Sequence, residues 1–173
     1  MAFNQASFFL YPPRHGPTVI ETEMKTVTGE PLKVIGSELA DADAPVVLNA
    51  DVLSWFQRRG FTEKESNEWA TVIFRDREET FLGVQEVVEL SIALDKAEFT
   101  EMYIRFLLTK TTPDRISDWR DLVVELGHDF DLKLMNPEDN TLIPCIDFPT
   151  ILAQDENFID LSKHFGWQLK EWG

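Results

Sequence analysis

The amino-acid sequence predicts an α+β fold in which an antiparallel or mixed sheet packs with several helices. Stretches in which apolar and polar residues alternate stand beside stretches with apolar residues at helical spacing, and strand and helix do not alternate regularly. Predicted hairpins also outnumber stretches suited to parallel crossover connections. The chain has 173 residues, 43% of them hydrophobic, which suits one compact core. We therefore expect residues 1–173 to form a single globular domain.

The N-terminal part of the chain is predicted to form three strands. Residues 7–11 are a compact aromatic run that two prolines end. Residues 18–27 and 32–35 are rich in β-branched residues and alternate in polarity. A glycine and a proline between them predict a hairpin.

Two consecutive helices are expected after this hairpin. Apolar residues between positions 52 and 59 have helical spacing, Asn49 or Asp51 is the expected cap, and a glycine follows the last turn. Thr62 and Glu65 have the spacing of a capping box, which predicts a second helix through Trp69. Together the two segments predict an αα-hairpin.

The middle of the chain is expected to form a strand followed by a helix. Residues 84–94 alternate between apolar and polar side chains, as in a strand. Residues 99–107 have the i, i+3, i+4, i+7, i+8 spacing of a helix with one buried face, through Phe99, Met102, Tyr103, Phe106 and Leu107.

A long helix is predicted from Thr112 to Gly127, with the threonine as cap, a proline at the first helical position and the glycine as its end. Residues 131–135 and 142–146 are expected to form a further hairpin, in which Pro144 indicates an edge position. Two short helices, near residues 149–153 and 157–165, are expected to complete the chain.

The long helix also carries a row of carboxylates. Its side chains Asp114, Asp118, Asp121 and Glu125, the acidic stripe, are spaced i, i+4, i+7 and i+11, which places them on one face. Asp129 and Asp131 are expected to extend the stripe past the end of the helix. A solvated helix face is one interpretation of this pattern. The other is a docking surface for a basic partner, because complementary fields accelerate encounter and select partners.

The charge of the whole chain favours the same class of partner. The formal net charge is −15, and it is uneven: residues 1–60 carry 5 basic and 7 acidic groups, and residues 61–173 carry 11 and 24. Such a field repels phosphate backbones and anionic lipid headgroups. We therefore expect neither nucleic acid nor a membrane as partner.

The cysteine content and the hydropathy of the chain indicate a cytoplasmic protein. Cys145 is the only cysteine, so no intramolecular disulfide is possible, and a reducing compartment is expected. The N-terminus lacks the features of a secretory signal. No stretch approaches the roughly 20 apolar residues of a membrane-spanning helix.

Catalytic motifs are missing from the sequence. It contains no phosphate-binding glycine loop, nucleophile elbow, HExxH or kinase signature. His128 with Asp129 or Asp131 is the one candidate for a metal-dependent hydrolase, but a metal site usually needs three or four ligands. Cys145 lies in an apolar segment, where a buried small hydrophobe is expected. No cofactor or metal is therefore expected.

The C-terminal segment contains Trp167 and Trp172. Trp167 is expected to cover the core. Trp172 stands next to the end of the chain and is a candidate anchor for a partner, because Trp is enriched among binding hot spots.

A small, acidic chain with one cysteine, abundant aromatic residues and no catalytic motif resembles the immunity proteins that bacteria make against toxins of interbacterial competition. The resemblance implies a non-catalytic protein that binds and neutralises a cognate toxin. The candidate binding residues are Asp114, Asp118, Asp121, Glu125, Asp129, Asp131 and Trp172. The alternatives are a carboxylate- or metal-dependent hydrolase, and an adaptor or accessory protein of a larger assembly. The oligomeric state stays open.

Overall fold

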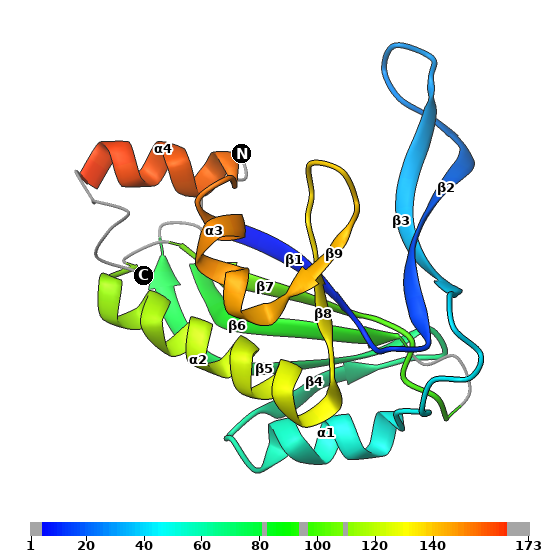
Figure 1. Ribbon diagram of the computed structural model, residues 1–173. Coiled ribbons are helices and arrows are strands. Elements are labelled where there is room, and N and C mark those ends of the chain that lie inside the picture. Colours follow the sequence, from blue (N-terminus) through cyan, green and yellow to red (C-terminus); the bar gives the residue numbers. More distant parts are fainter. Residues whose placement is uncertain (1–4, 81–82, 94–96, 109–110, 166–173) are drawn as a thin grey trace.

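The computed structural model describes residues 5–80, 83–93, 97–108 and 111–165. Its main element is a seven-stranded sheet with the order β4-β5-β6-β7-β1-β8-β9 (Figure 1). Every pair of neighbouring strands is antiparallel, which confirms the predicted α+β class. In chain order the strands are β1 (Gln5–Tyr11), β4 (Thr62–Ser66), β5 (Ala70–Thr80), β6 (Gly83–Ala93), β7 (Met102–Leu107), β8 (Lys133–Met135) and β9 (Leu142–Pro144).

A separate two-stranded sheet forms the predicted hairpin. It consists of β2 (His15–Lys25) and β3 (Pro31–Leu39), and it projects from the rest of the molecule (Figure 1). Gly29 in the turn has a φ of 85°, a left-handed conformation that glycine adopts without strain. The strands begin and end elsewhere than the sequence predicts: β2 starts three residues earlier, and β3 runs four residues further, because residues 15–18 pair with residues 36–39.

Four α-helices accompany the sheets in the described chain: α1 (Asn49–Gln57), α2 (Pro113–Phe130), α3 (Phe148–Leu152) and α4 (Glu156–Phe165). In Figure 1, α2 crosses in front of the main sheet and α1 lies below it. The helices at the C-terminal end confirm the two short helices expected there. None of the described helices has the length and apolar character needed to cross a membrane.

The core forms where α2 packs against the central strand β7. The rings of Phe106 and Trp119 are stacked, with centroids 4.5 Å apart and planes at 28°. Phe148 of α3 meets Phe106 edge-on at 5.5 Å and Phe8 of β1 at 5.1 Å. All four side chains are buried, and such aromatic contacts add to the free energy of burial. The packing of these rings fixes which side of α2 faces solvent.

The predicted helix over residues 99–107 is wrong, because Met102–Leu107 form strand β7 in the middle of the sheet. Met102, Ile104 and Phe106 are buried on the face toward α2, and Arg105 between them belongs to the opposite face. Apolar residues at positions 102 and 106 satisfy both a helical period and a period of two. The segment forms a strand because it pairs with β1 on one side and with β6 on the other.

The prediction of a second helix in an αα-hairpin is also wrong. Thr62–Ser66 form edge strand β4, which pairs with β5, and all five residues are exposed. Thr62 and Glu65 match a capping box, but no apolar stripe follows them that a helix would bury. The Asn67 side chain instead accepts hydrogen bonds from the backbone N–H groups of Trp69 and Ala70, which closes a hairpin turn.

Two of the expected helix ends differ from the structure. Leu48 precedes α1 without a side-chain cap, and Asn49 instead donates a hydrogen bond from its side chain to the carbonyl of Glu98. Thr112 caps α2 as predicted. The helix continues beyond Gly127. A glycine is needed at this position because a Cβ there would lie 2.6 Å from the Cys145 sulfur.

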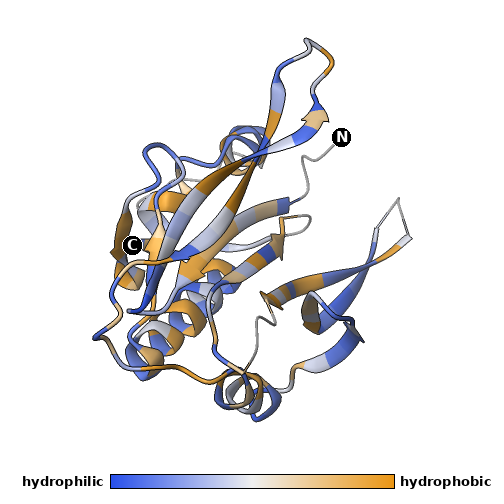
Figure 2. Cartoon of the chain, turned by 90° about the vertical axis from the view of Figure 1, so that its right-hand side faces the viewer, coloured by the Kyte–Doolittle hydropathy of each residue, from blue (hydrophilic) through white to orange (hydrophobic). Residues whose placement is uncertain are grey.

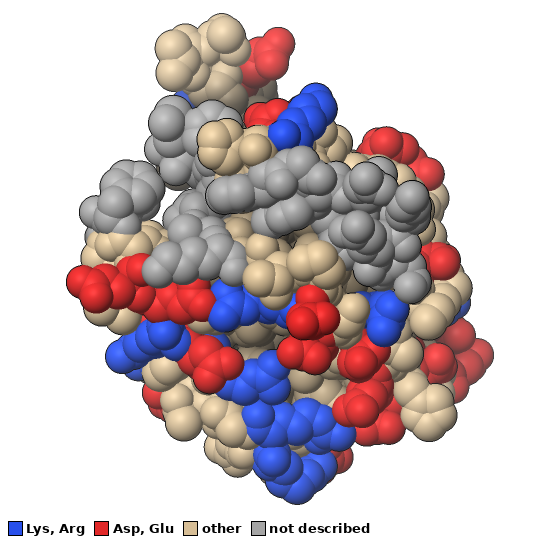
Figure 3. Space-filling view, turned by 90° about the vertical axis from the view of Figure 1, so that its left-hand side faces the viewer, with Lys and Arg blue, Asp and Glu red and all other residues tan. Residues whose placement is uncertain are grey.

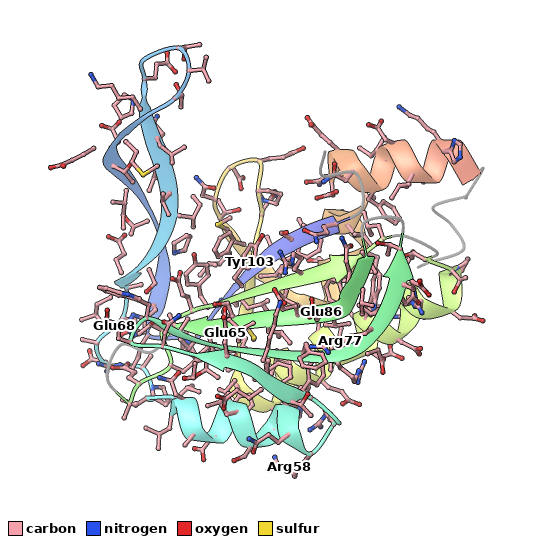
Figure 4. The ribbon with its side chains drawn as sticks, turned by 180° about the vertical axis from the view of Figure 1, so that it is seen from behind. Arg58, Glu65, Glu68, Arg77, Glu86 and Tyr103 are labelled. Carbon is pink, nitrogen blue, oxygen red and sulfur yellow. The ribbon has the colours of Figure 1, made fainter. Side chains whose placement is uncertain are left out.

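The face of the sheet away from α2 carries an ion-pair network. Lys64 of β4 lies 2.7 Å from Glu89 and 3.4 Å from Glu86 on β6. Arg77 pairs with Glu86 at 3.5 Å, and Arg105 pairs with Glu89. Figure 4 shows Arg77 and Glu86 on this face, with α2 behind the strands. Each of these charged groups has an oppositely charged partner within the network, so this face is a weaker candidate for a charged partner.

Replacing Phe106 by alanine tests the central packing. We expect Phe106→Ala to lower the free energy of unfolding by about 3–5 kcal/mol, because it removes a buried ring and leaves a cavity beside Trp119. Urea denaturation measures the change. Tyr103→Ala, on the opposite face of the same strand, is the control and should cost less. Equal losses for the two variants would contradict this assignment of the core.

Candidate functional site

The structure places the four residues of the acidic stripe on one exposed side of α2. Asp114, Asp118, Asp121 and Glu125 are all exposed, as predicted. The opposite side of the helix is buried through Ile116, Trp119, Leu122, Val123 and Leu126. Within the described chain, Asp114 and Asp118 make no ion pair, and Asp121 pairs with Arg120 at 3.1 Å. The N-terminal half of the stripe thus presents carboxylates to solvent.

Arg59, just after α1, joins the C-terminal half of the stripe. Its guanidinium lies over the Trp55 ring, 3.5 Å from the centroid. One of its nitrogens is 3.5 Å from a Glu125 oxygen and 3.9 Å from an Asp129 oxygen. A guanidinium held on an aromatic face is a common arrangement for orienting a charge. Glu125 and Asp129 are therefore partly neutralised, and α1 and α2 are linked.

Asp129 is the most firmly held of the predicted carboxylates. The indole N–H of Trp55 donates a hydrogen bond of 2.7 Å to it, and His128 lies 3.2 Å from its other oxygen. These two hydrogen bonds, the indole's first, hold the pKa of Asp129 below its ordinary value. Asp129 is thus charged at neutral pH and fixed in orientation.

A pocket of about 350 Å³ adjoins the stripe. It is lined by Arg59, Arg75, Asp118, Asp121, Leu122 and Glu125. Arg75 of β5 lies over the ring of Phe61, 4.8 Å from its centroid, and contacts the carbonyl of Arg59. In Figure 3, which looks toward the end where α2 begins, Lys and Arg side chains lie among Asp and Glu side chains. The surface beside the stripe is therefore of mixed charge, suited to recognising groups of both signs.

The sequence does not reveal the two arginines of this pocket. Arg75 lies in β5, a strand that the sequence does not predict, and the sequence predicts for Arg59 only a place in a helix. Arg59 stands four residues after Trp55, the spacing at which side chains meet on a helix. That spacing is the one signal in the sequence for the contact between them.

His128, Asp129 and Asp131 do not assemble a metal site. His128 is exposed, and of the two aspartates it contacts only Asp129. Asp131 ends α2 in a left-handed conformation, with a φ of 53°. Among the described residues, no group of three or more His, Cys, Asp and Glu side chains is placed to hold a metal ion. The ligand set of the alternative hydrolase is thus absent from the described part of the chain.

Cys145 is buried, as predicted, although it lies in a short 3₁₀ turn and not in a strand. Its thiol donates a hydrogen bond to the carbonyl of Leu132 and packs against Gly127. Burial raises the pKa of the thiol to about 12. A thiol in this state is a poor nucleophile at neutral pH.

The start of β2 contains a polar cluster that the sequence did not indicate. His15 lies 3.0 Å from Glu98, and Arg14 binds the same carboxylate oxygen at 2.7 Å. Tyr11 donates a hydrogen bond to the carbonyl of Gly36 on β3, and burial raises the pKa of its hydroxyl. Glu101 beside it is partly buried, which raises the pKa of that carboxyl. The cluster attaches the β2–β3 hairpin to the main sheet.

A second pocket, of about 240 Å³, lies at this attachment. Its lining includes His15, Ala40 and Asp41 from the base of the hairpin, and Asp131 and Lys133 from the end of α2 and β8. Asp131, directly after the last residue of α2, thus lies beside the base of the hairpin. Trp167 and Trp172 lie outside the described residues, so the role of Trp172 stays a prediction.

Comparisons with models of protein families, with curated proteins and with solved structures find no match to this chain.

Removing the indole N–H tests how Asp129 is held. In Trp55→Phe the pKa of Asp129 should rise, because its strongest hydrogen bond is lost. The folded-state pKa of Asp129 lies below its unfolded value. The wild type therefore gains stability above about pH 4 and loses it as the pH falls through the folded pKa.

An NMR titration of the Asp129 carboxyl measures this pKa directly. His128→Gln, which replaces the second hydrogen-bond partner, is the matched control and should raise the pKa less. An unchanged pKa in Trp55→Phe would contradict the assigned hydrogen bond.

Proposed function

We propose that this protein is a non-catalytic binding protein that docks onto a basic protein partner through α2. Its specific form is an immunity protein that neutralises a cognate bacterial toxin, as the resemblance noted above implies. The observation that supports the proposal most is the exposure of the whole acidic stripe on a helix whose opposite side is fixed in the core. A rigid helix presents its carboxylates in a constant pattern, which favours selective binding.

The net charge supports a role in rapid capture. A chain of net −15 attracts a cationic protein over roughly a Debye length, and the stripe gives that attraction a direction. Fast, charge-guided association is what an inhibitor needs in order to occupy its target before the target acts. Asp114 and Asp118 contribute most, because no ion pair within the described chain neutralises them.

The mixed-charge pocket supports selectivity for one partner. Arg59 and Arg75 stand beside Asp118, Asp121 and Glu125, so a surface that is uniformly positive would meet repulsion there. The complementary surface carries a carboxylate among its basic groups. A protein whose surface lacks this pattern places like charges against the pocket, which weakens its binding.

Co-expression with the protein encoded by the neighbouring gene tests the proposed function. We expect a stable complex on gel filtration, and rescue of growth where the neighbour alone is toxic. A neighbour that is toxic and is neither bound nor rescued would contradict the proposal. A complex without rescue would contradict its neutralising form and favour an adaptor.

Charge reversal on the stripe tests the docking face. In Asp118→Lys with Asp121→Lys, the association rate with this neighbour should fall by about 10-fold or more at low salt. The matched control is Glu156→Lys with Asp160→Lys, which changes the net charge equally on two exposed residues of α4. Stopped-flow fluorescence measures both rates. Equal slowing by the two pairs would exclude the stripe as the docking face.

A further inference from the structure

The β2–β3 hairpin (residues 15–39, the arm) carries most of the large apolar side chains that are exposed. Twelve large apolar side chains are exposed among the described residues. Seven of them lie on the arm: Val19, Ile20, Met24, Val27, Leu32, Val34 and Leu39. Figure 2 shows apolar residues along the arm out to its far end. Exposed apolar side chains gathered on one element mark an interaction site more often than scattered ones do.

The apolar residues of the arm lie on both of its faces. Val19 pairs with Ile35 across the strands, and the next pair, Ile20 with Val34, points to the other side. Ile20 is 49% exposed and Val34 44%. A strand pair with apolar residues on both faces is typical of a sheet that is covered on both faces. In the described part of the chain these side chains are exposed, so both faces of the outer arm are open to a partner.

The base of the arm is held firmly to the body. Tyr11 donates a hydrogen bond of 3.1 Å to the Gly36 carbonyl, and the backbone N–H of Ala40 donates one of 2.8 Å to the carbonyl of Arg14. The ion pairs of Glu98 with Arg14 and His15 add to this attachment. An isolated two-stranded hairpin is only marginally stable. The attachment keeps this one in place before binding, which lowers the entropic cost of association.

Charge decides between a second copy of this chain and a different partner. The arm carries four carboxylates, Glu21, Glu23, Glu30 and Glu38, against two lysines, Lys25 and Lys33. Pairing of two arms would bring acidic elements together between chains that each carry a net charge of −15. Such repulsion disfavours a second copy and favours a partner with Lys and Arg around an apolar groove.

The end of α2 lies beside the base of the arm. The pocket of about 240 Å³ brings Asp131, which directly follows the last residue of the helix, together with His15 and Ala40 at the base of the arm. A basic partner that docks along α2 therefore reaches the base of the arm at the end of the same helix.

We propose that the arm inserts Ile20, Val34 and their apolar neighbours into an apolar groove, bordered by Lys and Arg, on the basic protein that the acidic stripe attracts. This inference rests on the proposed function, and it assigns the association rate and the dissociation rate to different surfaces. The stripe sets the rate of encounter, because its field acts at a distance. The arm sets the lifetime of the complex, because desolvated apolar contacts are lost only on dissociation.

Kinetics with the neighbour-encoded protein test this division. In Ile20→Ser with Val34→Ser, the dissociation rate should rise by at least about 10-fold, with little change in the association rate. The matched control is Val84→Ser with Ile146→Ser, which removes two exposed apolar side chains outside the arm. It should leave both rates unchanged. An unchanged lifetime for the arm variant would overturn the proposal while leaving the proposed function intact; failure to form any complex would overturn the proposed function itself.

A labelled arm gives a second measurement that does not depend on how the serine variants fold. Met24 is 68% exposed, and the natural Cys145 is buried, so Met24→Cys provides one reactive thiol for an environment-sensitive fluorophore. The emission of this label should shift to the blue when the neighbour binds, whereas a label on Asp160→Cys in α4 should not respond. No response at position 24 would overturn the proposal.

Sedimentation of the protein alone tests the choice of occupant. We expect a monomer at micromolar concentration. A dimer that dissociates when Ile20→Ser and Val34→Ser are introduced would show that a second copy of the chain binds the arm. That result would overturn the proposal of a basic partner.

Discussion

The contact between Phe106 and Trp119 is the interaction on which the rest of the structure depends. It joins the central strand of the sheet to the middle of α2, with ring centroids 4.5 Å apart. Because Trp119 faces the sheet, residues 114, 118, 121 and 125 face solvent on the other side of the helix. Gly127 completes this arrangement, since the absence of its side chain lets the end of α2 approach Cys145. The acidic stripe is thus a consequence of how the core is packed.

The surface around the stripe is more selective than its acidity suggests. Arg59 is oriented by the Trp55 ring and reaches Glu125 and Asp129, so positive charge is fixed within the acidic face. The uncompensated carboxylates remain near the start of the helix. At the other end of the helix, Asp131 lies beside the base of the apolar arm. Helix α2 thus connects the exposed carboxylates near its start with the base of the arm near its end.

The sequence predicts the parts whose signals are local. The cap at Thr112, the proline after it and the buried stripe through Trp119 predict α2, and the alternating residues on either side of Gly29 predict the arm. The candidate site follows from the helix alone, because the spacing of its carboxylates fixes their common face. Their exposure confirms that placement, while their binding role stays a prediction.

The errors arise where two periods fit the same residues or where long-range pairing decides. Met102 and Phe106 satisfy helical spacing, but Ile104 between them is buried too, and this favours a strand between β1 and β6. Thr62 and Glu65 match a cap, yet they form an edge strand through pairing with β5. The contribution of Arg75 and the exposure of the arm depend on which distant segments meet, and local spacing carries no information on that.

The dependence of association on ionic strength tests charge-guided docking most directly. The rate constant for association with the neighbour-encoded protein would be measured from low salt to well above physiological ionic strength, where the Debye length falls below about 8 Å. Attraction by the acidic face predicts a steep fall in this rate constant, with a much smaller change in the dissociation rate. An association rate that does not change with salt would contradict it.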